Sequence, residues 1–299
     1  MPQLTPQDRH AYLVMAHNEP EVLAILLSML DDPRNDIYLH IDRRAVELRR
    51  QFDTWHPRHS RLFLLDDPEA VYWGDISQVK AELKLFEAAH LNGPYEYYHL
   101  LSGTCLPIKT QDHIHRFFSL NRGKEFVDYH ISDFNRRDTN RKVRFYWLFT
   151  THLRGKTKRT HMSVLRKVAY WIQLVSGLRR SRDIELFKGH NWVSVTDRLC
   201  AYMLDHKDEI IRRYRYTICA DEIFIHTLLW HSPLRDNIYR LADGSTSCSR
   251  GIDWQRGNPY VWREEDYDEL IASPCCFARK FSSHHLAIAT RLHDTLTRE

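Results

Sequence analysis

The chain has 299 residues, of which 43% are hydrophobic and 27% are charged, as expected for a folded protein with a sizeable core. Its 43 Lys and Arg outnumber its 39 Asp and Glu only slightly, which does not support general nucleic-acid binding. No apolar run is long enough to span a membrane, and the first nine residues lack the apolar core of a signal peptide. We therefore expect a soluble, cytoplasmic protein.

Short apolar runs alternate with helical patterns over the first hundred residues. Strands are predicted at residues 11–16, 37–41, 62–65 and 97–101. One helix is predicted to open near Pro20, and another covers residues 77–92, where Gly93 and Pro94 end the pattern. This alternation predicts an α/β fold with a mostly parallel sheet flanked by helices. Ligands of such sheets bind at the carboxyl ends of the strands.

The middle of the chain is strongly basic. Residues 136–182 contain 14 Lys or Arg and one acid, Asp138. Apolar residues recur at helical spacing over residues 163–178, so a basic amphipathic helix is predicted there. Two interpretations stay open: the helix packs its apolar face on the same domain, or it rests on a membrane surface. A nucleic-acid site is a third interpretation, but aromatic and basic residues do not recur together in any known pattern.

Cysteine spacing and motif absences narrow the chemistry. The six Cys form no Cys-x-x-Cys pair, so we expect reduced, buried thiols and no zinc ribbon. Glycine-rich phosphate loops, a Gly-x-Ser-x-Gly elbow and a His-Glu-x-x-His motif are all missing. These absences argue against dinucleotide, P-loop, serine-hydrolase and zincin chemistry.

Two short segments have residues suited to catalysis or anion binding. Asp221 and Glu222 stand between apolar residues, where a carboxylate is prone to a raised pKa that suits a general base. The alternative is that the pair caps a helix. Arg279 and Lys280 lie between two phenylalanines, an arrangement that forms either an anion clamp or a surface strand.

Seven segments resemble, in order and spacing, one enzyme family. They are AYLVMAH (11–17), YLHIDR (38–43), VYWG (71–74), HLLSGTCLPIK (99–109), LFKGHNW (186–192), ADE (220–222) and FARKF (277–281). The chain resembles the core-2/I-branching β-1,6-N-acetylglucosaminyltransferases, glycosyltransferase family 14, which includes peptide O-xylosyltransferases. The resemblance covers most of residues 11–282, and the missing anchor and few cysteines suit a bacterial-type member.

The resemblance implies a GT-A-type fold with a Rossmann-like sheet in a single compact domain over residues 1–299. Its expected parts are a nucleotide-sugar half (11–130), a basic, partly amphipathic helical insertion (136–182) and an acceptor and catalytic half (186–299). It also implies inversion at the anomeric carbon without a metal or another cofactor, because family members lack the Asp-x-Asp metal motif.

The resemblance also assigns roles to individual residues. Glu222 matches the general base, Lys280 matches one of two basic groups that stabilise the departing diphosphate, and Arg250 is aligned with the other. The residues expected to bind the nucleotide sugar are His17, Asp42, Trp73, Gly74, Ser102 and Gly103. Trp192 and Asp221 are expected beside the acceptor or the donor sugar. For Asp42 the alternative is a helix cap.

Two departures from the family pattern limit the transfer of specificity. Cys105 stands where an Asp is expected, which affects the donor sugar, and residues 128–144 match poorly where relatives bind acceptors. The leading hypothesis is transfer of N-acetylglucosamine from UDP-GlcNAc to a hydroxyl of a glycan acceptor, in polysaccharide biosynthesis. The alternatives are UDP-xylose or another UDP-sugar as donor, and a non-catalytic glycan- or anion-binding protein.

The expected partners follow from the same hypothesis. They are a UDP-sugar and a glycan acceptor, with no nucleic acid. If the acceptor is lipid-linked, residues 163–178 would rest on the inner face of a bacterial inner membrane, and the enzyme would be a peripheral membrane protein.

Overall fold

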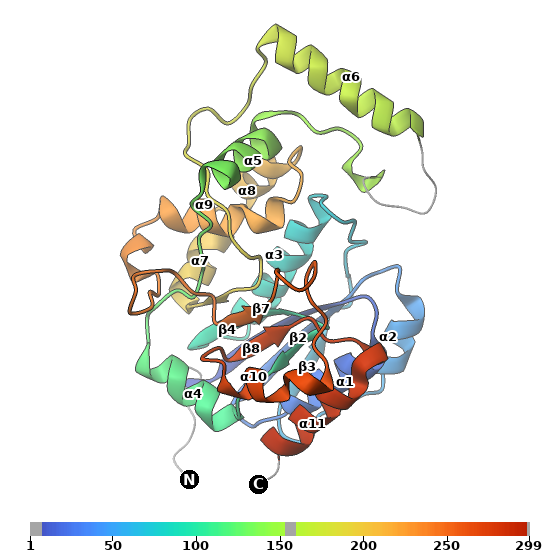
Figure 1. The fold of residues 1–299 in the computed structure, drawn as a ribbon, viewed down its shortest axis with the longest axis vertical. Helices are drawn as coiled ribbons and strands as arrows, with labels where there is room; N and C mark the ends of the chain where they lie inside the picture. The colour runs from blue at the N-terminus through green and yellow to red at the C-terminus, as the bar shows by residue number, and fades with distance from the viewer. Residues whose placement is uncertain (1–7, 153–159, 298–299) are drawn as a thin grey trace.

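The computed structural model describes residues 8–152 and 160–297, which fold around a five-stranded sheet (Figure 1). Its strands are β1 (His10–Ala16), β2 (Asn35–Ile41), β3 (Arg61–Leu64), β4 (Tyr97–Ser102) and β6 (Ser194–Val195). Their order is β3-β2-β1-β4-β6; the first four run parallel, and β6 is antiparallel to β4. The predicted α/β fold with a mostly parallel sheet is confirmed.

The central strand β1 is apolar from Ala11 to Ala16, as suits a strand whose two faces are buried. Ala11 and Leu13 belong to one hydrophobic core, whereas Tyr12, Val14 and Ala16 belong to the other. This division follows from the alternation of side chains along a strand. A sheet with two buried faces needs helices on both sides.

Each face of the sheet has its own helical layer. One layer comprises α3 (Ser77–His90), α7 (Asp197–Asp205), α8 (Lys207–Tyr214) and α9 (Phe224–Trp230). The other comprises α1 (Pro20–Met29), α2 (Val46–Phe52), α4 (Gln111–Leu120), α10 (Tyr267–Ala272) and α11 (Leu286–Leu296). Helix α1 begins with Pro20 at its first position, as predicted, and buries its apolar face completely.

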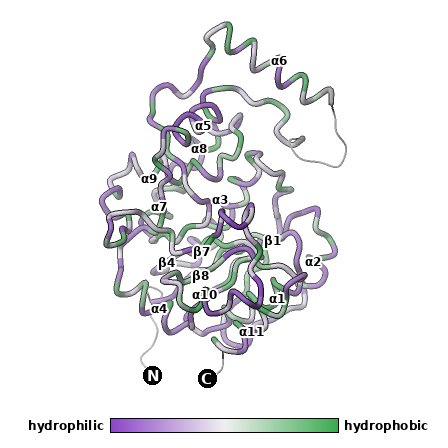
Figure 2. The backbone as a smooth tube through the Cα atoms, in the orientation of Figure 1, coloured by the Kyte–Doolittle hydropathy of each residue, from purple (hydrophilic) through white to green (hydrophobic). Residues whose placement is uncertain are grey.

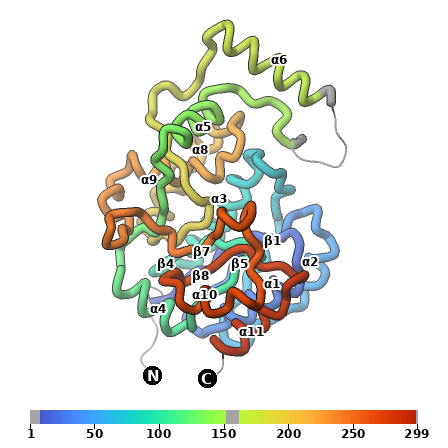
Figure 3. The backbone as a smooth tube through the Cα atoms, viewed as in Figure 1, coloured from blue at the N-terminus to red at the C-terminus, as the bar shows by residue number. Residues whose placement is uncertain are grey.

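A second, three-stranded sheet joins distant parts of the chain. It consists of β5 (Cys105–Pro107), β7 (Arg250–Ile252) and β8 (Phe277–Arg279) in the order β5-β8-β7. Strand β8 is antiparallel to β5 and parallel to β7. The C-terminal quarter of the chain therefore packs on the N-terminal half, as the colours of Figure 3 show. The packing thus crosses the boundary expected between a nucleotide-sugar half and a catalytic half.

The basic middle segment forms two helices, α5 (Asp133–Arg144) and α6 (Thr160–Ser176), at one end of the molecule (Figure 1). Helix α6 confirms the helix predicted over residues 163–178. Among the described residues, no helix is long and apolar enough to cross a bilayer. Short 3-10 turns complete the structure: η2 (Thr150–His152), η3 (Ala220–Glu222), η4 (Arg235–Asn237), η5 (Glu264–Asp266) and η6 (Ser283–His285). All six cysteines are free thiols, and five of them are buried, as expected.

Candidate active site

Glu222 ends the 3-10 turn η3 with its side chain partly exposed. The turn begins after Cys219, which has a left-handed backbone (φ 52°) and donates its N–H to the Gly74 carbonyl (3.0 Å). The Glu222 side chain is 38% exposed, and its Oε2 lies 3.5 Å from Lys142 Nζ and 3.8 Å from Lys188 Nζ. An accessible carboxylate beside two cations can accept a proton from a bound hydroxyl.

Asp138, the one acid of the basic segment, shares both lysines with Glu222. Its Oδ2 lies 3.0 Å from Lys142 Nζ and 3.4 Å from Lys188 Nζ. Partial burial acts to raise the pKa of Asp138, but hydrogen bonds from Arg141 and Lys142 lower it to about 2. The Asp138 carboxylate is therefore ionised at neutral pH and holds the two lysines in place. No sequence pattern assigned a role in the site to Asp138, Lys142 or Lys188, although Lys188 lies inside the LFKGHNW motif.

Asp221 points into the protein, away from its neighbour Glu222. Its Oδ2 accepts a hydrogen bond from Gln78 Nε2 (3.1 Å), and its Oδ1 has no partner among the described residues. Burial, followed by the charge of Glu222, raises the pKa of Asp221 to about 7. Gln78 in turn accepts from the N–H of Gly74 (2.7 Å). Asp221 thus connects the turn η3 to the Trp73–Gly74 turn, and its burial does not support the expected contact with a sugar.

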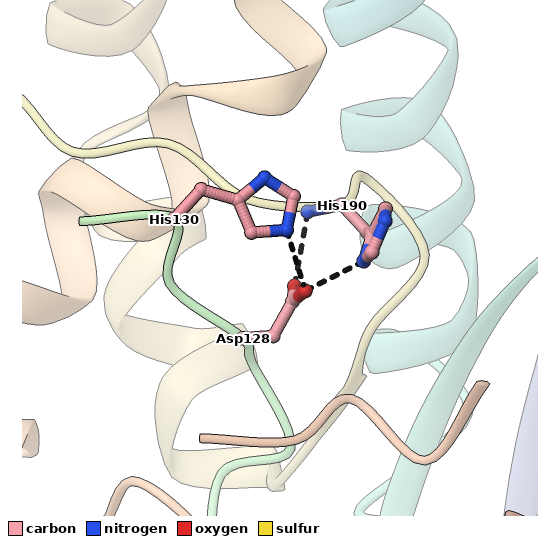
Figure 4. Close-up of side chains that lie close together, drawn as sticks. All are labelled: Asp128, His130 and His190. Carbon is pink, nitrogen blue, oxygen red and sulfur yellow. Dashed lines mark hydrogen bonds and ion pairs between the residues drawn. The ribbon is translucent and has the colours of Figure 1, made fainter. Parts of the chain in front are cut away.

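A cluster of Asp128 and histidines lies beside the catalytic turn (Figure 4). Asp128 Oδ2 lies 3.1 Å from His130 Nε2 and 2.5 Å from His190 Nδ1, while Oδ1 accepts the backbone N–H of His190 (2.9 Å). Burial acts to raise the pKa of Asp128, yet hydrogen bonds from His130 and His190 hold it well below its usual range. We expect no metal from the sequence, but the ligand atoms of Asp128, His130 and His190 lie within 4.8 Å of one another and could hold one.

The cluster anchors the loop that carries Lys188 and supports Glu222. Gly189 donates its N–H to the Glu222 carbonyl (3.0 Å), and a Cβ at Gly189 would lie 2.1 Å from the Asp128 carbonyl oxygen. Only glycine fits there. Trp254 Nε1 donates to His190 Nε2 (2.9 Å), so the Nδ1 of His190 must bear the proton that is donated to Asp128. The ring of His190 is thereby fixed in one tautomer and one orientation.

A second group of predicted residues gathers at the carboxyl ends of β1 and β2. His17 follows β1 with an exposed side chain. Partial desolvation lowers the pKa of His17; the charge of Asp42 acts to raise it, and those of Lys280 and Arg279 lower it further. Asp42, Lys280 and Arg279 are therefore all near enough to His17 to act on its charge. The resemblance assigned His17, Asp42 and Lys280 to the donor site but gave no role to Arg279.

Asp42 is neither a helix cap nor a free acceptor. Ala45 is the N-cap residue of α2, whereas the Asp42 carboxylate binds the backbone and guanidinium of Arg44 and accepts the N–H of Val71 (3.2 Å). These bonds fix the segment that leads to Trp73, which is 46% exposed. Asp42 thus positions the predicted nucleotide-binding turn.

Arg279 connects the end of β4 to Trp192. Its Nη1 donates to Ser102 Oγ (3.0 Å), and its guanidinium carbon lies 4.9 Å from the centre of the Trp192 ring. Gly103 follows, where a Cβ would come within 3.0 Å of the Ala16 Cβ. Cys105, in place of the expected Asp, is buried, and its Sγ accepts the N–H of Ser102 (3.4 Å).

Arg250 differs from the expectation that it contacts the leaving group. It is buried, and its guanidinium donates to four protein acceptors: Ser194 Oγ (2.7 Å) and the carbonyls of Cys248 (2.5 Å), Val193 (2.8 Å) and Leu100 (3.3 Å). These bonds use both terminal nitrogens inside the protein, and the buried Nε has no partner among the described residues. Lys280, by contrast, is partly exposed next to His17 and Arg279.

Comparisons with known proteins agree with the motif resemblance. The family model described as Core-2/I-Branching enzyme matches residues 10–270. Xylosyltransferase 2 of Canis lupus familiaris is 25% identical over 306 residues, which cover 93% of this chain and 32% of that protein. Xylosyltransferase 1 of Rattus norvegicus is 25% identical over 266 residues, which cover 82% and 30%. The chain thus spans about a third of the length of these relatives.

The crystal structure of mouse xyloside xylosyltransferase 1 in its apo form has 11% sequence identity and a TM-score of 0.40, over 90% of this chain and 96% of that chain.

Proposed function

The chain belongs to the Core-2/I-branching enzyme family, and from this we propose that it is an inverting glycosyltransferase that moves a sugar from UDP to a hydroxyl of a glycan acceptor. The observation that carries the proposal is the partly exposed Glu222 carboxylate, held beside Lys142 and Lys188. The family assignment alone does not say which residue acts as the base. This position makes Glu222 the candidate.

Glu222 acts as the general base of a single displacement. It takes the proton of the acceptor hydroxyl while that oxygen attacks the anomeric carbon from the side opposite the leaving group. The bond between the anomeric carbon and the β-phosphate oxygen breaks, and UDP departs with one additional negative charge. Inversion of the anomeric centre follows from this geometry.

Basic side chains replace a metal in stabilising the departing diphosphate. Lys280 keeps the role that the resemblance gives it. We assign the second contact to Arg279 instead of Arg250, because Arg279 is partly exposed and neighbours Lys280, whereas Arg250 is bonded inside the protein. A guanidinium and an ammonium together offer the donors that a diphosphate requires.

The nucleotide and the donor sugar are assigned to the strand ends. His17, the Asp42-supported Trp73–Gly74 turn and Ser102–Gly103 would hold the nucleotide, which matches the general position of ligands on parallel sheets. Trp192 would border the sugar. UDP-GlcNAc is the donor expected from the sequence, and the names of the relatives give UDP-xylose as the second candidate. We further propose that the protein is cytoplasmic and uses a glycan acceptor linked to lipid.

The first experiment measures UDP released from a panel of UDP-sugars, in excess EDTA, with and without a glycan acceptor mixture. We expect release from one donor, and a loss of about 10³-fold in Glu222→Gln because the variant has no base. Glu265→Gln is the matched control, since the Glu265 side chain is 67% exposed and lies in a different part of the chain. Its rate should equal that of the wild type.

Three outcomes would contradict parts of the proposal. Full turnover in Glu222→Gln would remove this residue as the base. Turnover that requires a divalent ion, and that Asp128→Asn loses even when the ion is present, would place a metal at the Asp128 cluster. That result would overturn the metal-free mechanism. UDP binding without release from any donor would favour the non-catalytic binding protein.

A further inference from the structure

Helix α6 turns its apolar face to the solvent. Seven apolar side chains on and just after the helix are between 48% and 85% exposed: Val164, Leu165, Val168, Trp171, Ile172, Val175 and Leu178. In Figure 2 the helix stands at the edge of the molecule with hydrophobic positions along its length. A surface helix of a globular protein normally does the reverse, because its apolar stripe faces the core. Of the two interpretations of this face, packing on the same domain is therefore wrong for the described residues.

The opposite face holds the helix in this orientation. Gln173 is buried, and its side-chain amide exchanges two hydrogen bonds with the backbone of Tyr146 (2.7 and 3.0 Å). The Tyr170 ring stacks on Trp147, with 5.5 Å between centroids. Arg166 donates to the Phe149 carbonyl (3.2 Å). Polar and aromatic contacts thus attach α6 to the domain and leave the apolar face outside.

The charges around this face are all positive. Residues 160–182 include five Lys or Arg and no Asp or Glu. Arg166, Arg179 and Arg182 donate to backbone carbonyls, which leave their charges unneutralised, and Lys167 is exposed beside Val168. The next acid along the chain, Asp183, pairs with Arg213 instead (2.9 Å).

We propose that α6 lies in the interfacial layer of an anionic lipid bilayer, with its apolar face among the acyl chains. An apolar face with a tryptophan and a basic border is the pattern of interfacial helices, whose binding sums apolar burial and attraction to anionic headgroups. A second copy of the chain would present the same positive charges and be repelled. The inference does not rest on the proposed enzymatic function.

The test is flotation of the purified full chain with lipid vesicles. We expect binding at low salt to vesicles of phosphatidylcholine with phosphatidylglycerol, less binding to phosphatidylcholine alone, and release as salt screens the headgroups. The double variant Trp171→Ser/Val175→Ser should lower the partition coefficient at least about tenfold. Lys167→Gln should lower it about fivefold, the contribution of one cation near such a surface.

A matched control removes exposed apolar side chains elsewhere. Leu91 and Leu120 are 81% and 80% exposed and lie at the ends of α3 and α4. The variant Leu91→Ser/Leu120→Ser should bind vesicles like the wild type, and thermal unfolding followed by circular dichroism should confirm that both double variants are folded.

Two results would overturn the inference. One concerns vesicle binding at low salt: the wild type and the Trp171→Ser/Val175→Ser variant bind the anionic vesicles equally, or neither protein binds them. The other is a wild-type dimer in sedimentation velocity that this variant dissociates while vesicles capture neither protein; the face would then be an interface between two copies.

Discussion

Arg250 and Arg279 both carry a guanidinium group, but Arg250 is buried and Arg279 is partly exposed. Arg250 is enclosed, and its two terminal nitrogens donate to a hydroxyl and three backbone carbonyls. Arg279 is only partly enclosed, and it stacks on Trp192 beside Lys280. Arg250 is therefore part of the interior, and Arg279 is the arginine that the proposed mechanism places at the diphosphate.

Conservative variants separate these two roles. Arg250→Lys cannot reach four acceptors, so we expect the free energy of unfolding to fall by about 2 kcal/mol. Arg279→Lys keeps the charge but loses the planar fork, so we expect the Kd for UDP to rise about tenfold with little change in stability. Urea unfolding and UDP titration of both variants provide the measurements. Weaker UDP binding by Arg250→Lys at unchanged stability would restore the original alignment.

Sequence motifs pointed to some residues of the candidate site, but not to their neighbours. Glu222 and Lys280 were singled out from their motifs. Lys142 was not, because it lies 80 positions from Glu222 and becomes its neighbour only through the packing of α5. Asp138 was visible as the one acid in a basic segment, but no pattern along the chain indicated its partner.

At the scale of single elements, the Gly189 loop controls where the catalytic turn sits. The loop is bonded on one side to Asp128 and on the other to the carbonyl of Glu222. Its backbone passes so close to Asp128 and His226 that no side chain fits at Gly189. A change here should therefore displace Glu222 without touching its side chain.

The variant Gly189→Ala tests this coupling. Its Cβ would meet the Asp128 carbonyl at 2.1 Å and His226 Nε2 at 2.6 Å, so we expect a loss of about 1–3 kcal/mol in the free energy of unfolding and a loss of activity beyond it. Gly251→Ala is the control, because the nearest atom to its Cβ would be 3.7 Å away. Urea unfolding and UDP release should distinguish the two. Normal activity in Gly189→Ala would show that the catalytic turn does not depend on this loop.

Helix α6 shows what a periodic pattern can and cannot predict. The spacing of its apolar residues predicted a helix in the correct place. It did not predict which way the face points, because orientation depends on contacts such as those of Gln173 with Tyr146, which lie 27 positions apart.

At the scale of the whole molecule, two buried acids lie where the helical layer meets the catalytic turn. Glu82 of α3 is fully buried, and burial, followed by the charge of Asp221, raises its pKa well above the usual range. Burial likewise raises the pKa of Asp221 to about 7. Both groups favour the protonated form in the folded protein.

The contribution of these two acids to the free energy of unfolding falls as the pH rises. Below the ordinary pKa of 3.8, Asp221 is protonated in both states; between 3.8 and about 7 only the unfolded chain ionises, so the free energy of unfolding decreases. Asp221→Asn should remove this loss, which is on the order of 4 kcal/mol at most by pH 8. Urea unfolding at pH 4.5 and pH 8 measures it, with exposed Asp236→Asn as the control. Equal pH profiles for Asp221→Asn and wild type would contradict the assignment.

Much of the fold was predictable because its central strands are long and apolar. Strands β1 to β4, helices α1 and α3 and the parallel sheet all followed from periodicity. The second sheet did not, since β5, β7 and β8 have three residues each and pair over long stretches of chain. Periodicity says nothing about such pairings, and the FARKF motif depends on them for its place in the site.

The pairing of β8 with β5 also sets the order in which the protein can be completed on the ribosome. Arg279 donates a hydrogen bond to Ser102, which lies 177 positions earlier in the chain. Arg279 and Lys280 therefore leave the ribosome long after strands β1 to β4. At roughly 5–20 residues per second, synthesis of the intervening chain takes on the order of ten seconds or more. Throughout that time the nascent strands β1 to β4 lack β8 and α11 on one face. The nascent chain therefore exposes apolar surface to chaperones, and Arg279 and Lys280 are missing from the strand ends until they have left the exit tunnel.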